Sequence, residues 1–419
     1  MRYKLVIFIL FCCSLTFSYA EGSKDLYPAG AQGGRAWLYS GAYSSFAIPF
    51  PTQGEHYVYV NAGEWISMAT SYQGLNSSTA SKIELYDPYG NAVSLTFSNT
   101  NTGKIPGRAS ELAGPHFPTQ SAAGNQYDGV YHHATISGIY KVLLKTNLSS
   151  STSYTGNIGN FGANENWTQP SNTNLIVAWD ISVCNSSETN WIPGRVYAYN
   201  FVMEIPMPTQ NPYKGGLYNK FKILTNDGFV YNVNMNGQNG IGFSFMVNSR
   251  GFYQPQAPTQ PIYKSINITG QNAQWIANRY HDPRLPDDQF TVTHKIFYNL
   301  PDGNIPATAI GGHIPGQSTW LLAQQPASVS NLSFAGAETT PNQMASNKGG
   351  YIRFNSSNGG NYSIKISPAT GTQAYTPRIL YGVAAVGSNE VYFDGKDGNG
   401  NELPEGVSNI TIEFNLGEV

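Results

Sequence analysis

Charged residues are scarce in this chain. Lys, Arg, Asp and Glu make up 11% of its 419 residues, and the formal net charge is −2. Nucleic-acid-binding proteins usually present a basic face, and no Lys/Arg-rich run supplies one, so we expect no nucleic-acid partner. The same balance offers no electrostatic attraction to an anionic membrane, and we expect no direct membrane insertion.

Cysteine is nearly absent as well. Two of the three cysteines fall in an apolar amino-terminal run. Residues 1–20 have the pattern of a secretory signal peptide, with a positive start, an apolar stretch and small residues before a cut at Glu21. Its removal leaves Cys184 alone, which excludes an intramolecular disulfide. We therefore predict a secreted or cell-surface protein whose stability comes from its hydrophobic core.

A sustained apolar repeat at helical spacing is missing, and helix-forming residues are sparse. What the chain has instead is 13% aromatic residues, 44 Gly and many short β-prone runs. Runs such as His56–Val60 and Trp65–Ala69 recur about every ten residues, with turn residues between them. This pattern predicts an all-β fold of tandem antiparallel β-sandwiches.

Stretches rich in Pro and Gly suggest where the domains divide. We expect a jelly-roll-like β-sandwich at residues 25–206, a middle β-rich domain at 217–325 and an immunoglobulin-like β-sandwich at 331–419. The first boundary is the proline-rich segment Pro206–Gly216. Within the first domain, Asn99–His133 is low in strand signal and is predicted to be a long surface loop.

The last predicted domain contains a distinctive segment, Tyr392–Gly406, which reads YFDGKDGNGNELPEG. Its pattern, aromatic-Asp-Gly-x-Asp-x-x-Gly-x-x-Leu-Pro-x-Gly, resembles the immunoglobulin-like domain of flagellar hook-capping proteins. Two residues depart from that family: Phe393 stands where Trp is usual, and Ser408 where an aromatic usually begins the next strand. The resemblance implies an immunoglobulin-like fold for the end of the chain.

Two further resemblances concern earlier segments. The runs VYVNAGEWI and IELYDPYG resemble jelly-roll modules of secreted bacterial proteins. The runs WDISV, IPGRVY and LTNDGFVYNVNMNG resemble the N-terminal region of large secreted adhesin-like surface proteins of the Bacteroidota. They imply a non-catalytic adhesive or structural role toward an extracellular glycan or the surface of a host or neighbouring cell. They also imply that the chain is the front part of a longer multi-module protein.

Oxygen-bearing side chains recur in the distinctive segment, and two interpretations of them stay open. They could bind Ca²⁺, which prefers several oxygen ligands, while the glycines provide a tight backbone path. Alternatively, Asp and Asn cap their own turn. A further calcium candidate is Asp282, Asp287 and Asp288. The residues of the first candidate are Asp394, Asp397, Asn399 and Asn401.

Secreted β-rich proteins are often glycoside hydrolases, which need two carboxylates facing each other across a cleft. The acids here are few, no spacing links a pair, and no nucleophile or metal-protease motif occurs. We therefore expect no enzymatic activity, and a hydrolase is the less favoured alternative. The acids considered are Glu64, Glu84, Asp180, Glu204 and Asp288.

Carbohydrate binding is the main alternative function. An exposed aromatic face packs well on the apolar face of a sugar ring, although most Trp residues of a sandwich belong to its core. Trp167 and Trp191 lie in the polar contexts NWT and NWI, so these two are predicted to be exposed and to bind sugar.

Overall fold

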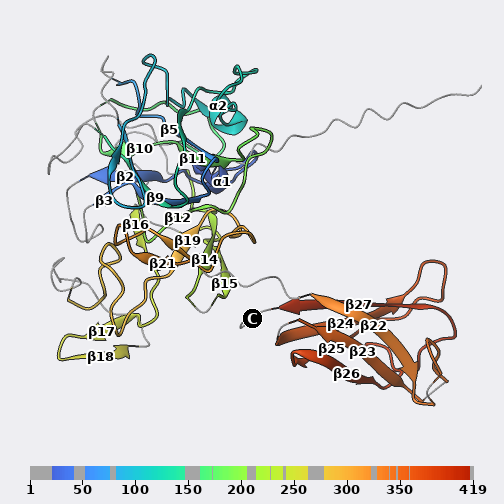
Figure 1. The fold of residues 1–419 in the computed structure, drawn as a ribbon. Helices are drawn as coiled ribbons and strands as arrows, with labels where there is room; N and C mark the ends of the chain where they lie inside the picture. Colours follow the sequence, from blue (N-terminus) through green and yellow to red (C-terminus); the bar gives the residue numbers. More distant parts are fainter. Residues whose placement is uncertain are drawn as a thin grey trace, which may run out of the picture. The chain divides into compact units, whose positions relative to one another are not determined.

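The chain folds into two compact units, Met1–Ala323 (unit 1) and Gln324–Val419 (unit 2). The computed structural model describes residues 21–41, 52–75, 82–146, 161–171, 173–204, 214–226, 228–238, 242–262, 278–321, 328–338, 340–345, 348–357 and 359–415. The predicted signal peptide, residues 1–20, lies outside the described residues. Both units are built from antiparallel strands, which confirms the predicted all-β fold (Figure 1).

The largest sheet of unit 1 has eight strands, all paired antiparallel. They are β4 (Glu55–Val60), β6 (Ile83–Tyr86), β7 (Ala92–Val93), β9 (Gly138–Leu144), β12 (Val196–Ala198), β14 (Lys220–Leu224), β15 (Val230–Asn234) and β19 (Lys295–Phe297). Their order across the sheet is β15-β14-β19-β12-β4-β9-β6-β7.

Two smaller sheets complete the core of unit 1. One has the order β1-β11-β5-β8, and the other β10-β2-β13-β16 with β3 paired to β2. Hairpins β17–β18 and β20–β21 and two short helices, α1 and α2, are added to them. The bounds are β1 (Glu21–Gly22), β11 (Trp179–Cys184), β5 (Trp65–Thr70), β8 (Val130–His133), β10 (Leu175–Ile176), β2 (Trp37–Gly41), β13 (Phe201–Glu204), β16 (Gly242–Phe245), β3 (Thr52–Gln53), β17 (Phe252–Gln254), β18 (Ala257–Ile262), β20 (Thr308–Ile310), β21 (Ser318–Trp320), α1 (Ser23–Leu26) and α2 (Arg108–Ala113).

The boundary predicted at residues 206–216 does not separate two compact units. Strands β14 and β19 follow it in sequence, yet they lie in the same sheet as β12 and β4, which precede it. The core agrees, because Val58 from one side of the boundary and Phe221 from the other belong to one buried cluster. Proline ends a strand, but it does not prevent the chain from returning to the sheet that it left.

The segment Asn99–His133, predicted to be a surface loop, contains α2 and β8. β8 pairs with β5 from Met68↔Val130 to Trp65↔His133. The polar composition of the segment suggested exposure to water. In the structure several of its polar side chains are buried and bonded to one another, so that prediction was wrong.

β4 illustrates why the core of unit 1 extends to both faces of its largest sheet. Successive side chains of a strand point to opposite faces. Val58 and Val60 pack into one buried cluster, while Tyr57 and Tyr59 pack into another on the opposite face. A run such as HYVYV therefore forms a strand that is buried on both sides.

Unit 2 is a sandwich of two three-stranded sheets, ordered β22-β23-β26 and β25-β24-β27 (Figure 1). Inward-facing side chains of both sheets form its core, including Phe354 of the first sheet and Ile364 of the second. The bounds are β22 (Val329–Gly336), β23 (Gly350–Ser356), β24 (Gly360–Pro368), β25 (Arg378–Ala384), β26 (Gly387–Phe393) and β27 (Ser408–Asn415).

Edge strand β25 shows the alternation of a half-buried strand. Ile379, Tyr381 and Val383 are 44%, 77% and 77% exposed, whereas Leu380 packs against the core. The exposed row therefore contributes little to the stability of unit 2.

Two substitutions that remove the same atoms test this assignment of faces. Ile364 is fully buried and Ile379 is exposed on the neighbouring strand. We expect Ile364→Ala to lower the unfolding free energy of unit 2 by about 2–5 kcal/mol, because it leaves a cavity. Ile379→Ala should change it by less than about 0.5 kcal/mol.

All seven Trp residues lie in unit 1, so urea unfolding followed by circular dichroism, with Trp fluorescence in parallel, separates the two transitions. Equal losses from the two substitutions would contradict the burial pattern of β24 and β25.

Candidate functional site

A buried carboxylate, that of Glu111 on α2, is the centre of a polar network in unit 1. Gly107 precedes the helix, and Gly114, with φ of 77°, ends it. Arg108 and Glu111 are three positions apart in this short helix, so their side chains lie on the same face, and both are buried. They are 4% and 2% exposed.

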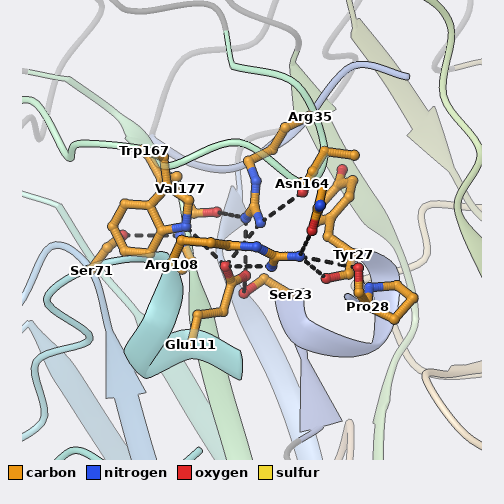
Figure 2. Close-up of polar contacts among 12 residues, drawn as sticks. Ser23, Tyr27, Pro28, Arg35, Ser71, Arg108, Glu111, Asn164, Trp167 and Val177 are labelled. Atoms are coloured by element: carbon orange, nitrogen blue, oxygen red, sulfur yellow. Dashed lines mark hydrogen bonds and ion pairs between the residues drawn. The ribbon is translucent and has the colours of Figure 1, made fainter. Parts of the chain in front are cut away.

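Five hydrogen bonds converge on the Glu111 carboxylate (Figure 2). The Arg35 guanidinium binds both oxygens, with Nη1 3.0 Å from Oε1 and Nη2 2.9 Å from Oε2. Arg108 Nη1 donates to Oε2 at 2.8 Å. The Ser23 hydroxyl donates to Oε1 at 2.6 Å, and the Trp167 indole N–H donates to Oε2 at 2.9 Å.

The same network holds the amino-terminal segment inside unit 1. Arg108 Nη2 donates to the Tyr27 carbonyl at 2.7 Å. The Tyr27 hydroxyl accepts the Ala36 N–H at 2.9 Å, and Arg35 Nη1 donates to the Val177 carbonyl at 3.1 Å. Residues 23–36 are thus attached to α2 and to the connection between β10 and β11.

The charge state of Glu111 follows from these contacts. Burial raises the pKa of this carboxyl, but the charge of Arg35 and its hydrogen bonds outweigh burial, and the pKa lies below its ordinary value. Glu111 is therefore ionised at neutral pH. A carboxylate that already accepts five donors has no free lone pair to offer a substrate, so its role is to hold the fold.

The two Trp residues predicted to bind sugar have different surroundings. Trp167 is 4% exposed, so its predicted exposure is wrong. Its polar neighbours in sequence were misleading, because the indole N–H finds its acceptor, Glu111, inside the protein. Trp191 is half-buried and stacks on Phe117 with 5.0 Å between ring centroids.

The segment predicted to bind calcium forms hydrogen bonds within its own loop. Asp397 is 5% exposed, and its Oδ1 accepts the backbone N–H groups of Asn399 and Asn401 at 2.9 and 2.8 Å. Asp394 forms an ion pair with Arg378 at 3.3 Å. These contacts are those of a turn capped by its own side chains, and calcium binding stays a prediction.

The second calcium candidate divides into separate local contacts. Asp282 pairs with Arg284 at 2.5 Å, and Asp287 Oδ2 accepts the indole N–H of Trp320 at 3.2 Å. Asp288 accepts backbone N–H groups of its own turn. Across the described residues, no group of three or more His, Cys, Asp or Glu side chains could hold a metal ion.

Each acid considered for hydrolysis has its own structural surroundings. Burial raises the pKa of two of them, that of Asp180 to about 6 and that of Glu204. Glu64 accepts the Asn61 N–H at 2.7 Å, and Glu84 forms an ion pair with Lys145 at 2.6 Å. Asp180 accepts the Tyr127 hydroxyl at 2.7 Å. Glu204 is the last residue of β13, and Asp288 caps its own turn.

A hollow of about 420 Å³ lies beside α1, where the amino-terminal segment meets the β14–β15 hairpin. Its volume is in the range of small-ligand sites. Much of its lining is polar and uncharged. The lining includes Tyr27, Gln32, Tyr218, Asn219, Asn234 and Asn236.

Asn219 is the least satisfied polar group of this hollow. It is 1% exposed, and its Nδ2 donates to the Tyr27 hydroxyl at 3.1 Å. Its Oδ1 is buried and has no hydrogen-bond partner among the described residues. Buried acceptors are nearly always bonded, so this unbonded oxygen next to the hollow suggests a buried water as its donor.

The wall of the hollow depends on a close approach of two backbone segments. Gly33 has φ of +76°, and a Cβ there would lie 2.0 Å from the Gly216 carbonyl oxygen and 2.7 Å from the Tyr218 ring. Only glycine allows this contact, which sets Tyr218 against the loop before Arg35. Tyr218 remains 43% exposed.

Sequence reasoning missed Arg35, Arg108, Glu111 and Asn219. One signal was present, because Arg108 and Glu111 have the spacing of a helical ion pair. It lay in a segment whose composition is that of a loop. For Asn219 no local signal exists, since its partner Tyr27 is nearly two hundred positions away in the chain (|i−j| = 192).

Comparisons with known proteins leave the chain without an assigned family. No family model matches it. No curated protein matches it either. The crystal structure of a DUF4785 family protein from Legionella pneumophila subsp. pneumophila str. Philadelphia 1 is 8% identical, with 87% of this chain and 80% of that one covered. Its TM-score of 0.15 is too low to support an inference.

In the part of the chain that the structure describes, no helix is long and apolar enough to cross a membrane.

Substitution of Glu111 tests whether the network holds unit 1 together. Glu111→Gln leaves two buried guanidinium groups without their counter-charge, and we expect it to cost unit 1 about 3–5 kcal/mol of unfolding free energy. Glu165→Gln is the matched control, because the Glu165 side chain is 49% exposed in its ion pair with Lys214. It should cost less than about 1 kcal/mol.

Urea unfolding followed by Trp fluorescence measures both substitutions. The pKa of Glu111 is depressed in the folded state, so its contribution is present above the unfolded pKa of about 4.3 and is lost as the pH falls through the folded pKa. The difference between wild type and Glu111→Gln should therefore shrink in acid. Equal costs for the two substitutions at neutral pH would refute the central role of Glu111.

Proposed function

We propose that the protein is a non-catalytic extracellular binding protein with an adhesive role, and that the hollow beside α1 binds a sugar of a glycan. The observation that carries this proposal is a hollow whose lining includes several side-chain amides and two Tyr residues, beside the buried and unbonded Oδ1 of Asn219. The signal-peptide pattern of residues 1–20 supports a secreted or cell-surface location.

The chemistry of the lining suits a polyhydroxylated ligand. A sugar hydroxyl both donates and accepts hydrogen bonds, and side-chain amides do the same through separate atoms. Gln32, Asn234 and Asn236 supply amides to the lining of the hollow. The exposed ring of Tyr218 offers an apolar face for the sugar ring.

An adhesive role accounts for the rest of the chain. Unit 2 is a separate sandwich that follows the binding unit, as expected of a spacer or presenting module. The resemblance of WDISV and LTNDGFVYNVNMNG to adhesin-like proteins of the Bacteroidota supports the same role. In this proposal the chain is the front part of a longer surface protein that attaches to host or neighbouring cells.

A glycan array probed with the chain from Glu21 to Val419 tests sugar binding. We expect discrete hits that Tyr218→Ala weakens at least tenfold, corresponding to about 1.4 kcal/mol of lost binding free energy. Tyr231→Ala is the matched control, because Tyr231, on β15, is 40% exposed and does not line the hollow. It should bind like the wild type.

Silence on the array, or equal losses from both Tyr substitutions, would contradict a sugar site in the hollow. Binding that is lost in Trp191→Ala and kept in Tyr218→Ala would move the site to the stacked pair of Trp191 and Phe117. Silence together with normal folding would favour a structural role for the protein.

A further inference from the structure

The amino-terminal strand of unit 1 lies on a group of buried carboxylates. β1 pairs with β11, with Glu21 opposite Ile181 and Gly22 opposite Asp180. Glu21 is 0% exposed and Asp180 is 2% exposed. Asp25, on α1, is half-buried and lies near both of them. A strand at the start of a chain is rarely so deeply buried unless it is held there.

Each carboxylate is held by hydrogen bonds from the backbone or from hydroxyl groups. Glu21 accepts the N–H groups of Gly194 and Arg195 at 2.8 and 3.0 Å. Asp25 accepts the Gly22 N–H at 3.2 Å. Asp180 accepts the hydroxyls of Tyr127 and Ser182, each at 2.7 Å.

Positive charge is short at this place. Burial raises the pKa of Glu21 to about 8, of Asp25 to about 7 and of Asp180 to about 6. Lys24 lowers the pKa of Asp25 and of Asp180, but its own pKa is lowered by burial. The described groups around the site thus balance the three acids only in part.

The other charged or titratable neighbours do not make up the difference. The Arg195 guanidinium is directed to Asp302, at 2.6 Å, and to Glu64, at 3.6 Å. Tyr127 donates to Asp180, and burial raises its pKa well above the ordinary value, so it stays neutral. Tyr298 is buried, and its pKa is raised in the same way.

We propose that removal of the signal peptide supplies the missing charge, because the new α-ammonium group of Glu21 forms a buried ion pair with Asp180. The nitrogen lies close to this carboxyl, since β1 pairs with β11 with Gly22 opposite Asp180, and the Glu21 N–H lowers the pKa of Asp180. The cut predicted from the sequence falls directly before this nitrogen. Cleavage thus turns a neutral donor into a charged one at a position fixed by the pairing of β1 with β11.

The chemical step is ordinary peptide hydrolysis by an external signal peptidase. One water molecule is consumed, the bond between Ala20 and Glu21 breaks, and Ala20 leaves with the carboxylate. Glu21 keeps the amine, which takes up a proton at neutral pH because an α-amino group has a pKa of about 8. A precursor that retains its leader lacks this ion pair and is therefore less stable than the mature protein.

The test compares two full chains that differ only at the amino terminus. The native chain begins at Glu21 and is released from a fusion by a protease that leaves no extra residue. The extended chain carries Gly-Ser before Glu21, so its Glu21 nitrogen is a neutral amide, as in the precursor. We expect the extended chain to have a lower melting temperature, by roughly 5 °C, in Trp fluorescence.

Asp180→Asn, placed in both chains, shows whether charge causes the difference. The ion pair predicts that the gap in melting temperature largely disappears in this background. Equal melting of the two starting chains would overturn the proposal. A gap that Asp180→Asn leaves unchanged would overturn it too, because the extension would then only disturb packing.

The pH dependence gives an independent readout that needs no substitution. The ion pair raises the folded pKa of the α-ammonium group. The contribution of this group to the unfolding free energy is therefore complete below about pH 8 and is lost as the pH rises through the folded pKa. In the extended chain the folded pKa values of the three acids are raised, so the unfolding free energy should fall as the pH rises from about 4 to about 8. The gap should therefore open toward neutral pH and close in alkali. A gap constant from about pH 6 to about pH 10 would overturn the proposal.

Two further measurements address the amine directly and do not involve glycan binding. The intact mass of the secreted protein should correspond to a chain that begins at Glu21, and any other start would overturn the proposal. In the folded native chain the α-amine should resist reductive methylation, whereas the amine of the extended chain should react as fast as in urea. Equal reactivity of the two folded chains would contradict a buried ammonium group.

Discussion

A carboxylate removed from water must be matched by fixed charges, and Glu111 meets this constraint with two guanidinium groups. The rest of unit 1 is arranged so that these three groups meet. Arg35 comes from the amino-terminal segment, while Arg108 and Glu111 come from α2. Ser23 and Trp167 supply the remaining donors. Burial of one charge thus fixes segments that are far apart in the sequence.

The amino-terminal segment links this network to the proposed sugar site and to the proposed ion pair at Glu21. Its Tyr27 hydroxyl holds the amide of Asn219 in the hollow, and its Ser23 hydroxyl binds Glu111. The side-chain carboxylate of Glu21 accepts hydrogen bonds from the backbone N–H groups of Gly194 and Arg195, just before β12. The stability of unit 1 and the shape of the hollow therefore depend on the same residues, 21–27.

Local patterns in the sequence predicted the strands well and their partners poorly. The alternation of HYVYV in β4 is a property of a few neighbouring residues, so it could be predicted. The joining of β14 and β19 to β12 in one sheet depends on long-range packing, and the proline-rich segment between them suggested the opposite. Polar residues were the main source of error. Trp167 and Glu111 lie in polar segments but bind each other inside the core, which composition alone does not reveal.

The amino-terminal segment is an integral part of unit 1. Urea unfolding followed by Trp fluorescence tests this dependence by comparing the chain that begins at Glu21 with one that begins at Pro28. All seven Trp residues lie in unit 1, so the signal reports on that unit alone. Loss of Ser23 and Tyr27 should lower the unfolding midpoint of unit 1 by about 1 M urea or more, while circular dichroism shows the transition of unit 2 unchanged. An unchanged midpoint for unit 1 would contradict the account.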